Sequence, residues 1–286
     1  MSRSNVARLL VSCRDREGII ATLSEALRDV GANIITSDQF SSDPYGGSFS
    51  LRMEFYVPDD AEERLTKLEA RLNEIASVLH LDHHLIDARR RKRVALFVSR
   101  YDHCLLDLLW RWRSGQLDMD VVAVVSNHPD LQEEVARFGV PYHHIPITPE
   151  TKAEAEQAEL DLLSGEVELI VMARYMQVLS EDFLSRIGCP VINIHHSFLP
   201  AFAGAGPYQR AHSRGVKLIG ATAHYATQDL DEGPIIEQDV IRVTHRESAA
   251  ELERIGADVE RLVLARAVGW HLQDRILLQG HRTIVF

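Results

Sequence analysis

The sequence has few of the features that mark secreted, membrane-bound or nucleic-acid-binding proteins. Three cysteines, Cys13, Cys104 and Cys189, are spread over 286 residues, so neither a disulfide framework nor a zinc ribbon is predicted. No apolar run approaches about 18 residues, and the opening "MSRSNVARLLVSC" has too short an apolar stretch for a secretory signal. We therefore expect a cytoplasmic protein without a membrane span.

Positive charge is also in deficit. The chain has 31 Lys and Arg against 42 Asp and Glu, a formal net charge of −11. Because nucleic acids and anionic membranes attract basic surfaces, this balance argues against either as a partner. Aromatic residues make up 7% and hydrophobic residues 45% of the chain, an ordinary globular composition that is sufficient for two buried cores.

One short basic run, "DARRRKR" at residues 87–93, breaks the chain into two parts. Such a run is typical of a solvated linker. A nucleic-acid patch is the alternative, which the acidic balance of the whole chain does not favour. We predict a first domain over residues 1–86, a linker over 87–92 and a second domain over 93–286.

The first part alternates between two periodicities. "RLLVSC", "NIITSDQF", "SFSLRMEFYV" and "VLHLDHHLI" have the composition of strands, and Phe49, Leu51 and Met53 alternate as on a strand with one buried face. "EGIIATLSEALRDVG" and "DDAEERLTKLEARLNEIA" have helical spacing. The order strand, helix, strand, strand, helix, strand predicts an α+β, ferredoxin-like domain.

Two short motifs add a family resemblance. The strand, then "CRDREGII", then a helix and "GAN" resembles the ACT domain, a small module that commonly binds amino acids. The resemblance implies a regulatory ligand site at Asp15, Gly18 and Asn33, with glycine or methionine as the amino-acid effector. The alternative is that these are ordinary turn and strand-entry residues. ACT modules often pair through an exposed edge, so a homo-oligomer is expected.

The second part has continuous apolar runs separated by helical stretches. "RVALFVS", "DVVAVVS", "VELIVMA" and "PVINIHH" are typical of parallel strands buried on both faces. "LIGATAHYA" and "GPIIEQDVIRV" predict an antiparallel pair at one edge, and residues 248–275 predict one long helix. The second domain is therefore expected to be an α/β open sheet of Rossmann-like type, which binds ligands at the carboxyl ends of its strands.

Polar side chains gather where one predicted parallel strand ends. Asn193 and His195 are two residues apart, so both project from one face of the strand. Downstream, "HYATQDLDEGPII" supplies His224, Asp229 and Asp231 in an acidic loop. An amide donor beside an imidazole suits a developing oxyanion, and a carboxylate can take a proton from water. Each residue alone is also typical of a satisfied polar group, whereas the group together favours acyl transfer without a metal or covalent nucleophile.

The motifs "NIHHSFLPAF" and "LDEGPII" resemble the formyltetrahydrofolate-dependent formyltransferase family over residues 93–286. The resemblance implies that Asn193, His195 and Asp231 are catalytic, and that folate is a substrate with no other cofactor and no metal. It also implies contacts to the folate from "ARYMQVLS" at residues 173–180. The implied substrate-binding residues are Tyr175, Met176, Gln177, Val178, Leu179, His196, His224 and Gly233.

Two departures from the transferases favour water as the formyl acceptor. The ribonucleotide transferases of the family have a Gly- and Ser-rich loop that cradles a phosphate, whereas residues 98–109, "VSRYDHCLLDLL", have no glycine and add Asp102. His196 stands where the transferases usually have proline. Together with the ACT module, these features resemble the hydrolytic members of the family. Those members hydrolyse 10-formyltetrahydrofolate to formate and tetrahydrofolate, and they usually have a basic residue where Gly206 stands.

The resemblance assigns one role to each catalytic residue. Asn193 donates to the formyl oxygen, His195 stabilises the oxyanion, and Asp231 orients and deprotonates water; His196 either shapes the water site or only packs. The reaction would supply formate for purine synthesis and balance one-carbon pools. Three rival functions stay open: transfer to an unidentified amine, transfer to an aminoacyl-tRNA, and folate sensing without turnover.

Overall fold

The computed structural model describes three stretches of the chain, residues 5–58, 60–201 and 206–286. These residues divide into two compact units. Unit 1 extends to Arg91 and includes two C-terminal segments, Asp274–Leu277 and Ile284–Phe286; unit 2 consists of Lys92–Gln273 and Leu278–Thr283. The expected second domain includes the whole C-terminus, so the division differs from that expectation at 274–277 and 284–286.

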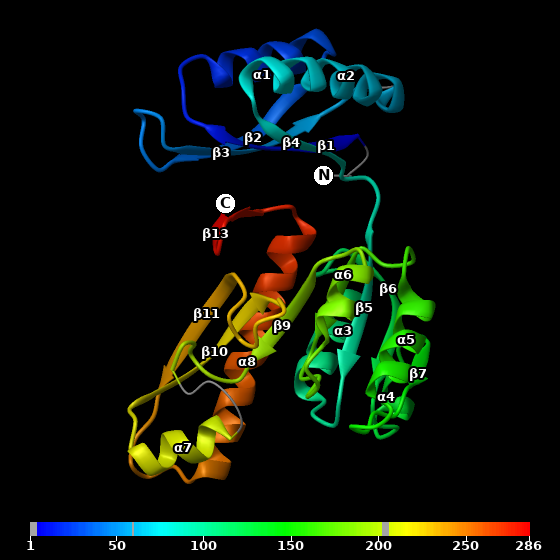
Figure 1. The fold of residues 1–286 in the computed structure, drawn as a ribbon, viewed down its shortest axis with the longest axis vertical. Coiled ribbons are helices and arrows are strands. Elements are labelled where there is room, and N and C mark those ends of the chain that lie inside the picture. The colour runs from blue at the N-terminus through cyan, green and yellow to red at the C-terminus, as the bar shows by residue number, and fades with distance from the viewer. Residues whose placement is uncertain (1–4, 59, 202–205) are drawn as a thin grey trace. The chain divides into compact units, whose positions relative to one another are not determined.

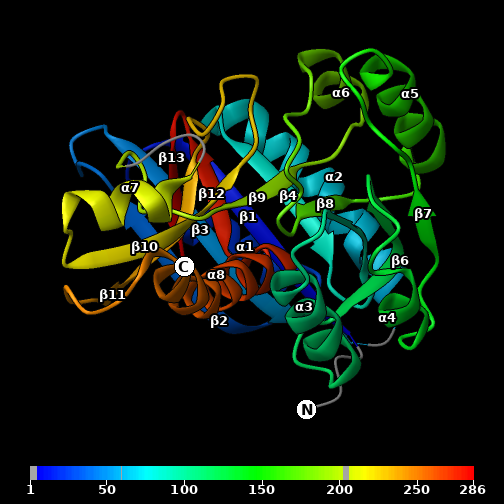
Figure 2. The same cartoon turned by 90° about the horizontal axis from the view of Figure 1, so that it is seen from below.

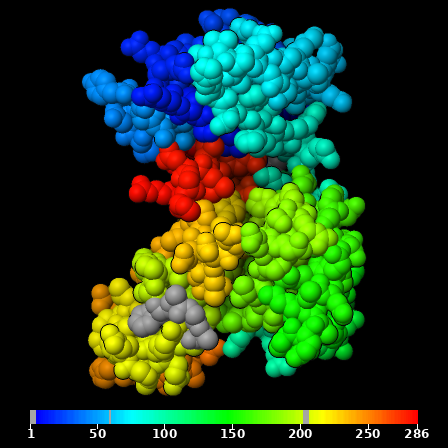
Figure 3. Space-filling view, in the orientation of Figure 1, coloured from blue at the N-terminus to red at the C-terminus, as the bar shows by residue number. Residues whose placement is uncertain are grey.

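Unit 1 has the ferredoxin-like plan that the sequence predicts. A four-stranded antiparallel sheet has the order β2-β3-β1-β4, and Figure 1 shows both helices on one face of it. The side chains of these helices form a continuous outer surface (Figure 3). The elements are β1 (Val6–Arg14), α1 (Ile19–Asp29), β2 (Asn33–Ser41), β3 (Ser48–Tyr56), α2 (Ala61–Leu79) and β4 (Asp82–Asp87).

The second face of this sheet is covered as well, which differs from the expected strand with one buried face. Leu51 and Met53 point into the core beneath the helices, and Arg52 between them is also buried, at 6% exposure. Asp274 explains this burial, because its carboxylate pairs with Arg8 at 2.9 Å and its carbonyl accepts a hydrogen bond from Arg52 at 3.1 Å. A buried charge needs such a partner, so the C-terminal segment completes unit 1.

Unit 2 is built on a seven-stranded mixed sheet with the order β11-β10-β9-β8-β5-β6-β7. The strands from β9 to β7 are parallel, and the expected antiparallel pair, β10 with β11, forms one edge. The Rossmann-like expectation is confirmed. The strands are β5 (Lys92–Val98), β6 (Met119–Ser126), β7 (Tyr142–His144), β8 (Leu169–Met172), β9 (Val191–His195), β10 (Leu218–Tyr225) and β11 (Ile235–Arg242).

Helices cover both faces of the sheet of unit 2. Figure 2 shows α3 (His103–Arg113) and α8 (Ala249–Leu272) on one face, and α5 (Lys152–Leu163) and α6 (Glu181–Arg186) on the other. The other two helices described in unit 2 are α4 (Gln132–Ala136) and α7 (Pro207–Arg214). No helix in the described ranges is long and apolar enough to cross a membrane.

The long helix α8 begins and ends close to where its sequence predicts. Ser248 and Glu251 form a reciprocal capping box at its start, and the helix ends at Leu272 rather than near Arg275. A hairpin of β12 (Ile276–Gln279) and β13 (Arg282–Val285) follows, which the sequence does not predict.

Candidate active site

Asn193 and His195 lie at the carboxyl end of β9, with Ile194 turned to the other face. Strand β10 pairs with β9 so that His224 stands opposite Asn193, and the Asn193 Nδ2 atom is 3.2 Å from His224 Nε2. His224 Nδ1 is 2.9 Å from the carbonyl oxygen of Tyr225, so this nitrogen carries the proton and Nε2 accepts from the amide. Burial lowers the pKa of His224, which agrees with this neutral form.

The loop after β10 brings Asp231 to the same place. Asp231 has a left-handed backbone, φ 59°, and a Cβ added to Gly233 would lie 1.7 Å from the carbonyl oxygen of Tyr225. Only glycine therefore allows this close turn. Asp231 Oδ1 is 3.1 Å from His195 Nδ1 and 3.9 Å from His224 Nε2. The three residues with expected catalytic roles thus meet in one buried group.

The His195 ring has one nitrogen in use and one available. Its Nδ1 atom faces Asp231, and its Nε2 atom is buried without a hydrogen-bond partner among the described residues. A carboxylate on one ring nitrogen fixes the orientation of the imidazole. His195 Nε2 is therefore held ready to donate to a substrate atom.

These side chains open into a cavity of about 210 Å³ with predominantly apolar walls. Residues 175–179, His196 and His224 all line it, as expected of substrate-binding residues, whereas Gly233 is absent from its walls and fixes the turn instead. The Tyr175 hydroxyl points away and donates to Glu159 at 2.7 Å. The lining residues without an expected role are Met172, Arg174, Leu184, Ile194, Ala226, Thr227, Asp229 and Leu230.

His196 and Tyr208 connect the cavity to a buried charged group. The His196 ring lies 5.2 Å from that of His195 and 5.9 Å from that of Tyr208, between centroids. The Tyr208 hydroxyl donates to Glu260 Oε1 at 2.6 Å, and Glu260 itself is 1% exposed. Burial, reinforced by the charge of Arg174, lowers the pKa of His196 to about 3, so this imidazole is neutral beside His195.

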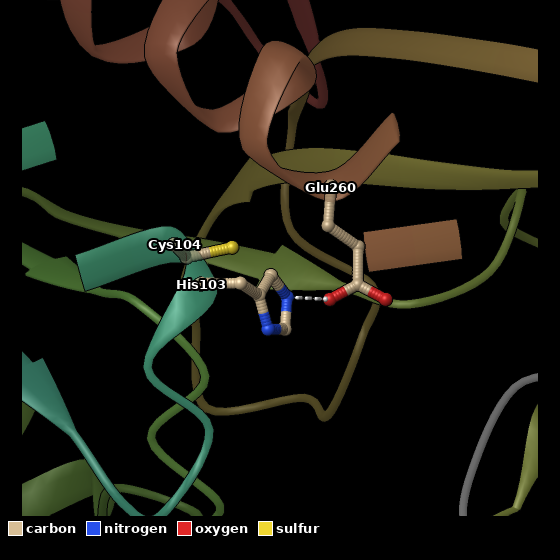
Figure 4. Close-up of side chains that lie close together, drawn as sticks. All are labelled: His103, Cys104 and Glu260. Carbon is tan, nitrogen blue, oxygen red and sulfur yellow. Dashed lines mark hydrogen bonds and ion pairs between the residues drawn. The ribbon is translucent and has the colours of Figure 1, made fainter. Parts of the chain in front are cut away.

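Glu260, His103 and Cys104 lie close enough together to suggest a metal centre. Figure 4 shows His103 facing the carboxylate of Glu260, at 2.8 Å from Nε2 to Oε2, with no interaction drawn to Cys104. Arg174 Nε is 3.4 Å from the same oxygen, which supplies a positive charge where a metal ion would sit. Burial raises the pKa of the Cys104 thiol well above its usual value, so it is a poor metal ligand.

The carboxylate of Glu260 is ionised although it is buried. Burial opposes ionisation most strongly, but the hydrogen bond with His103, the charge of Arg174 and the Tyr208 hydroxyl together hold the pKa of Glu260 below its ordinary value. We name His103, Arg174, Tyr208 and Glu260 the Glu260 cluster. Its members come from α3, α7, α8 and the loop after β8.

The neutral state of His196 gives the protein a pH-dependent stability. The pKa of His196 is about 3 in the folded protein, whereas a solvent-exposed imidazole in the unfolded chain has its ordinary pKa of 6.5. The unfolded state therefore binds more protons between these values, and the free energy of unfolding falls as pH drops below 6.5. We expect His196→Asn to lose less stability than the wild type between pH 7 and pH 5 in chemical denaturation. An equal loss in both proteins would contradict the neutral assignment.

The three residues expected to form a regulatory site are not gathered within one chain. Asp15 follows β1 beside Gly47, with its backbone N–H donating to the Gly47 carbonyl at 2.7 Å, and Gly18 begins α1 with φ 86°. Asn33 is at the far end of the sheet, because it pairs with Tyr56, which in turn pairs with Val6. Eight residue steps along β1 put roughly 26 Å between the two ends.

Comparison with protein families and curated proteins decides the family. Residues 92–268 match the formyl transferase family model and residues 7–76 match the ACT domain model. The chain is 56% identical, over 99% of its length and 91% of the relative's, to formyltetrahydrofolate deformylase of Mycobacterium tuberculosis (strain ATCC 25618 / H37Rv). It is 50% identical to that of Bacillus subtilis (strain 168), over 98% of this chain and 93% of the relative.

The chain belongs to the formyltetrahydrofolate deformylase family. As a member of this family it is an enzyme, a hydrolase. The crystal structure of formyltetrahydrofolate deformylase from Burkholderia mallei superposes with a TM-score of 0.91 at 43% identity, covering 99% of both chains. Glycinamide ribonucleotide transformylase 1 from Symbiobacterium toebii covers 68% of this chain and 94% of its own, with a TM-score of 0.64 at 27% identity. The deformylase family therefore accounts for both units.

The Glu260 cluster is the part of this deformylase site that sequence reasoning missed. His103 and Glu260 are 157 positions apart, and Tyr208 and Glu260 are 52 apart, so no local motif connects them. The usable signal was Arg174, a basic residue directly after an apolar strand. Its left-handed backbone, φ 66°, is uncommon for a residue other than glycine.

Proposed function

We propose that this chain hydrolyses 10-formyltetrahydrofolate to formate and tetrahydrofolate. The observation that carries the proposal is the meeting of Asn193, His195 and Asp231 at the wall of one cavity. An amide, an imidazole and a carboxylate supply oxyanion stabilisation and a base without a covalent nucleophile. The family relationship supports the choice of substrate.

The loop after β5 supports water over an amine as the acceptor. The Ser99 backbone N–H donates to the carbonyl of Arg174 at 3.2 Å, so it is not available to a phosphate. At the end of this loop, His103 is bonded to the carboxylate of Glu260, which adds a buried negative charge. A phosphate-bearing amine would need free N–H groups here, which favours hydrolysis.

The walls of the cavity suit a folate ring. Val178, Leu179 and Ile194 give it apolar faces, and burying a flat ring against such faces is favourable by roughly 25 cal/mol per Å². Polar backbone groups of residues 175–179 would orient the ring edge, as in most small-molecule sites.

The chain's own side chains carry every step of the proposed mechanism. Water attacks the formyl carbon and gives a proton to Asp231, while the second N–H of the Asn193 amide donates to the formyl oxygen. His195, with Nδ1 donating to Asp231, donates from Nε2 to the developing oxyanion and then passes that proton to N10. The C–N10 bond breaks to give tetrahydrofolate and formic acid, which loses its proton to solvent and leaves as formate, and Asp231 passes the proton that it took from water back to His195.

The proposed function is tested by supplying substrate to the purified full-length protein without any amine. We expect formate and tetrahydrofolate to appear in equal amounts at full rate. Release that requires an added amine would indicate a transferase, and tight folate binding without turnover would indicate a folate sensor.

We also propose that glycine or methionine regulates the reaction through unit 1, and that chains pair there. Strand β2 is an edge strand and all its residues are exposed, and exposed edges favour pairing with another chain. Pairing would also supply, from a second chain, the half of the ligand site that one chain lacks. Adding either amino acid should change the rate, and Asp15→Asn should abolish that change while Glu25→Gln keeps it. A wild-type rate that neither amino acid alters would exclude this regulation.

The proposed reaction takes place in the cytoplasm, in keeping with the unpaired cysteines. It would supply formate for purine synthesis and balance the one-carbon pools.

A further inference from the structure

We infer that Arg174 holds the carboxylate of the formate product inside the candidate active-site cavity. The inference rests on the proposed function, because that function generates formate there. It adds a binding site for a small carboxylate to the residues that perform hydrolysis.

Arg174 is a buried cation whose donors are not used up. The residue is 4% exposed, and within the described part of the chain its Nε and Nη1 atoms have no hydrogen-bond partner. Its nearest carboxylate oxygen, Glu260 Oε2, is 3.4 Å from Nε. Glu260 instead makes shorter bonds to His103 and Tyr208, at 2.8 and 2.6 Å. Buried donors are nearly always satisfied, so Nη1, which has no such carboxylate beside it, indicates a ligand.

The guanidinium is held in a fixed position. Its central carbon lies 4.6 Å from the centroid of the Tyr101 ring, a cation–π contact. The Arg174 backbone has φ 66°, and its carbonyl accepts from the Ser99 N–H, while the Ser99 hydroxyl accepts from the Met176 N–H at 3.0 Å. A strained backbone that its neighbours hold on both sides is typical of a functional position.

The charged side chains around the cavity favour an anion at Arg174. Arg174 is the only Lys or Arg among the described residues that line the cavity, whereas Asp229 and Asp231 line it as carboxylates. The neighbouring His196 is neutral and therefore does not compete for an anion. An anion formed at the cavity is attracted to Arg174 and repelled by the two aspartates.

Formate fits this position better than phosphate does. A planar guanidinium can pair end-on with the two oxygens of a carboxylate, through one N–H of Nη1 and one of Nη2, which leaves Nε facing Glu260. A phosphate dianion needs further donors, and the Ser99 N–H is already bonded to the Arg174 carbonyl. The buried Glu260 carboxylate also repels a second negative charge. The site therefore matches a small, singly charged, planar anion.

The test measures binding of ¹³C-formate to the full-length protein in the presence of tetrahydrofolate, by line broadening. We expect saturable binding that nitrate, a planar anion, displaces and that formamide, a neutral molecule of similar shape, does not. Arg174→Gln should weaken binding by about tenfold or more, as expected for loss of a charge-assisted pair. Arg174→Lys keeps the positive charge but loses the planar pair of donors, so its affinity for formate should lie between those of the wild type and Arg174→Gln. The control Arg100→Gln removes an exposed arginine that does not line the cavity, and this variant should bind formate as the wild type does.

Several outcomes would overturn the inference. These are equal formate binding in Arg174→Gln and the wild type, no saturable binding in the wild type, or stronger displacement by phosphate than by nitrate. If Arg174→Gln does not fold, the inference is tested on the wild type alone, by whether nitrate displaces formate more strongly than phosphate and formamide do. Failure of the proposed function gives a different result, because formate would then bind at Arg174 without being produced by the protein. If only this inference fails, formate is still released, but its binding does not depend on Arg174.

Discussion

Asp231→Asn is expected to reduce formate release by about a thousandfold or more, because the amide cannot take a proton from water and no longer gives the His195 ring a carboxylate as its hydrogen-bond partner. The carboxylate is 8% exposed and 3.1 Å from His195 Nδ1, so both losses act at the reacting atoms. Tetrahydrofolate should still bind, since the apolar walls of the cavity are unchanged. Steady-state formate release and fluorescence titration with tetrahydrofolate measure the two effects.

The matched control for Asp231→Asn is Glu232→Gln, which removes the charge of the next, exposed residue. It should retain wild-type activity. Retention of most activity by Asp231→Asn would exclude Asp231 as the base, and loss of tetrahydrofolate binding in that variant would indicate a collapsed loop instead.

Asn193→Ala is expected to raise the barrier by about 3–4 kcal/mol, a loss of roughly 10²–10³ in kcat, because one oxyanion donor is removed. The change in KM should be small, since the amide acts mainly on the charge that develops in the transition state. The truncation also leaves His224 Nε2 without its partner at 3.2 Å. Steady-state kinetics separate the effects on kcat and KM.

Ile192→Val is the control for Asn193→Ala, because Ile192 is fully buried in the same strand and its truncation tests the strand alone. Its activity should remain near that of the wild type. A decrease of only a few-fold for Asn193→Ala would show that the amide is not an oxyanion donor.

The periodicity of the sequence predicted most of the fold because both units bury their strands in regular patterns. The continuous apolar runs of β5, β6, β8 and β9 identified the parallel sheet, and the helix–strand order identified the ferredoxin-like unit. The C-terminal hairpin was missed, since β12 and β13 are four residues each. Nothing local shows that Asp274 pairs with Arg8, 266 positions away.

The sequence predicted only those parts of the candidate site whose residues are close together in the chain. Asn193 and His195 share a strand, so their common face follows from their spacing. Asp231 reaches them because β10 pairs with β9 and Gly233 permits the turn. The sequence showed an acidic loop there, and only family resemblance singled out Asp231 from Asp229. The Glu260 cluster has no local pattern at all, because four separate segments supply its members.

The most direct test of the account is the origin of the oxygen atoms in formate. Hydrolysis in H₂¹⁸O, with no amine present, should give formate with one ¹⁸O and one oxygen from the formyl group, as read by mass spectrometry of a single turnover. This outcome requires water to attack the formyl carbon, as proposed for the group of Asn193, His195 and Asp231. Unlabelled formate, or formation of a formylated amine in place of formate, would contradict it.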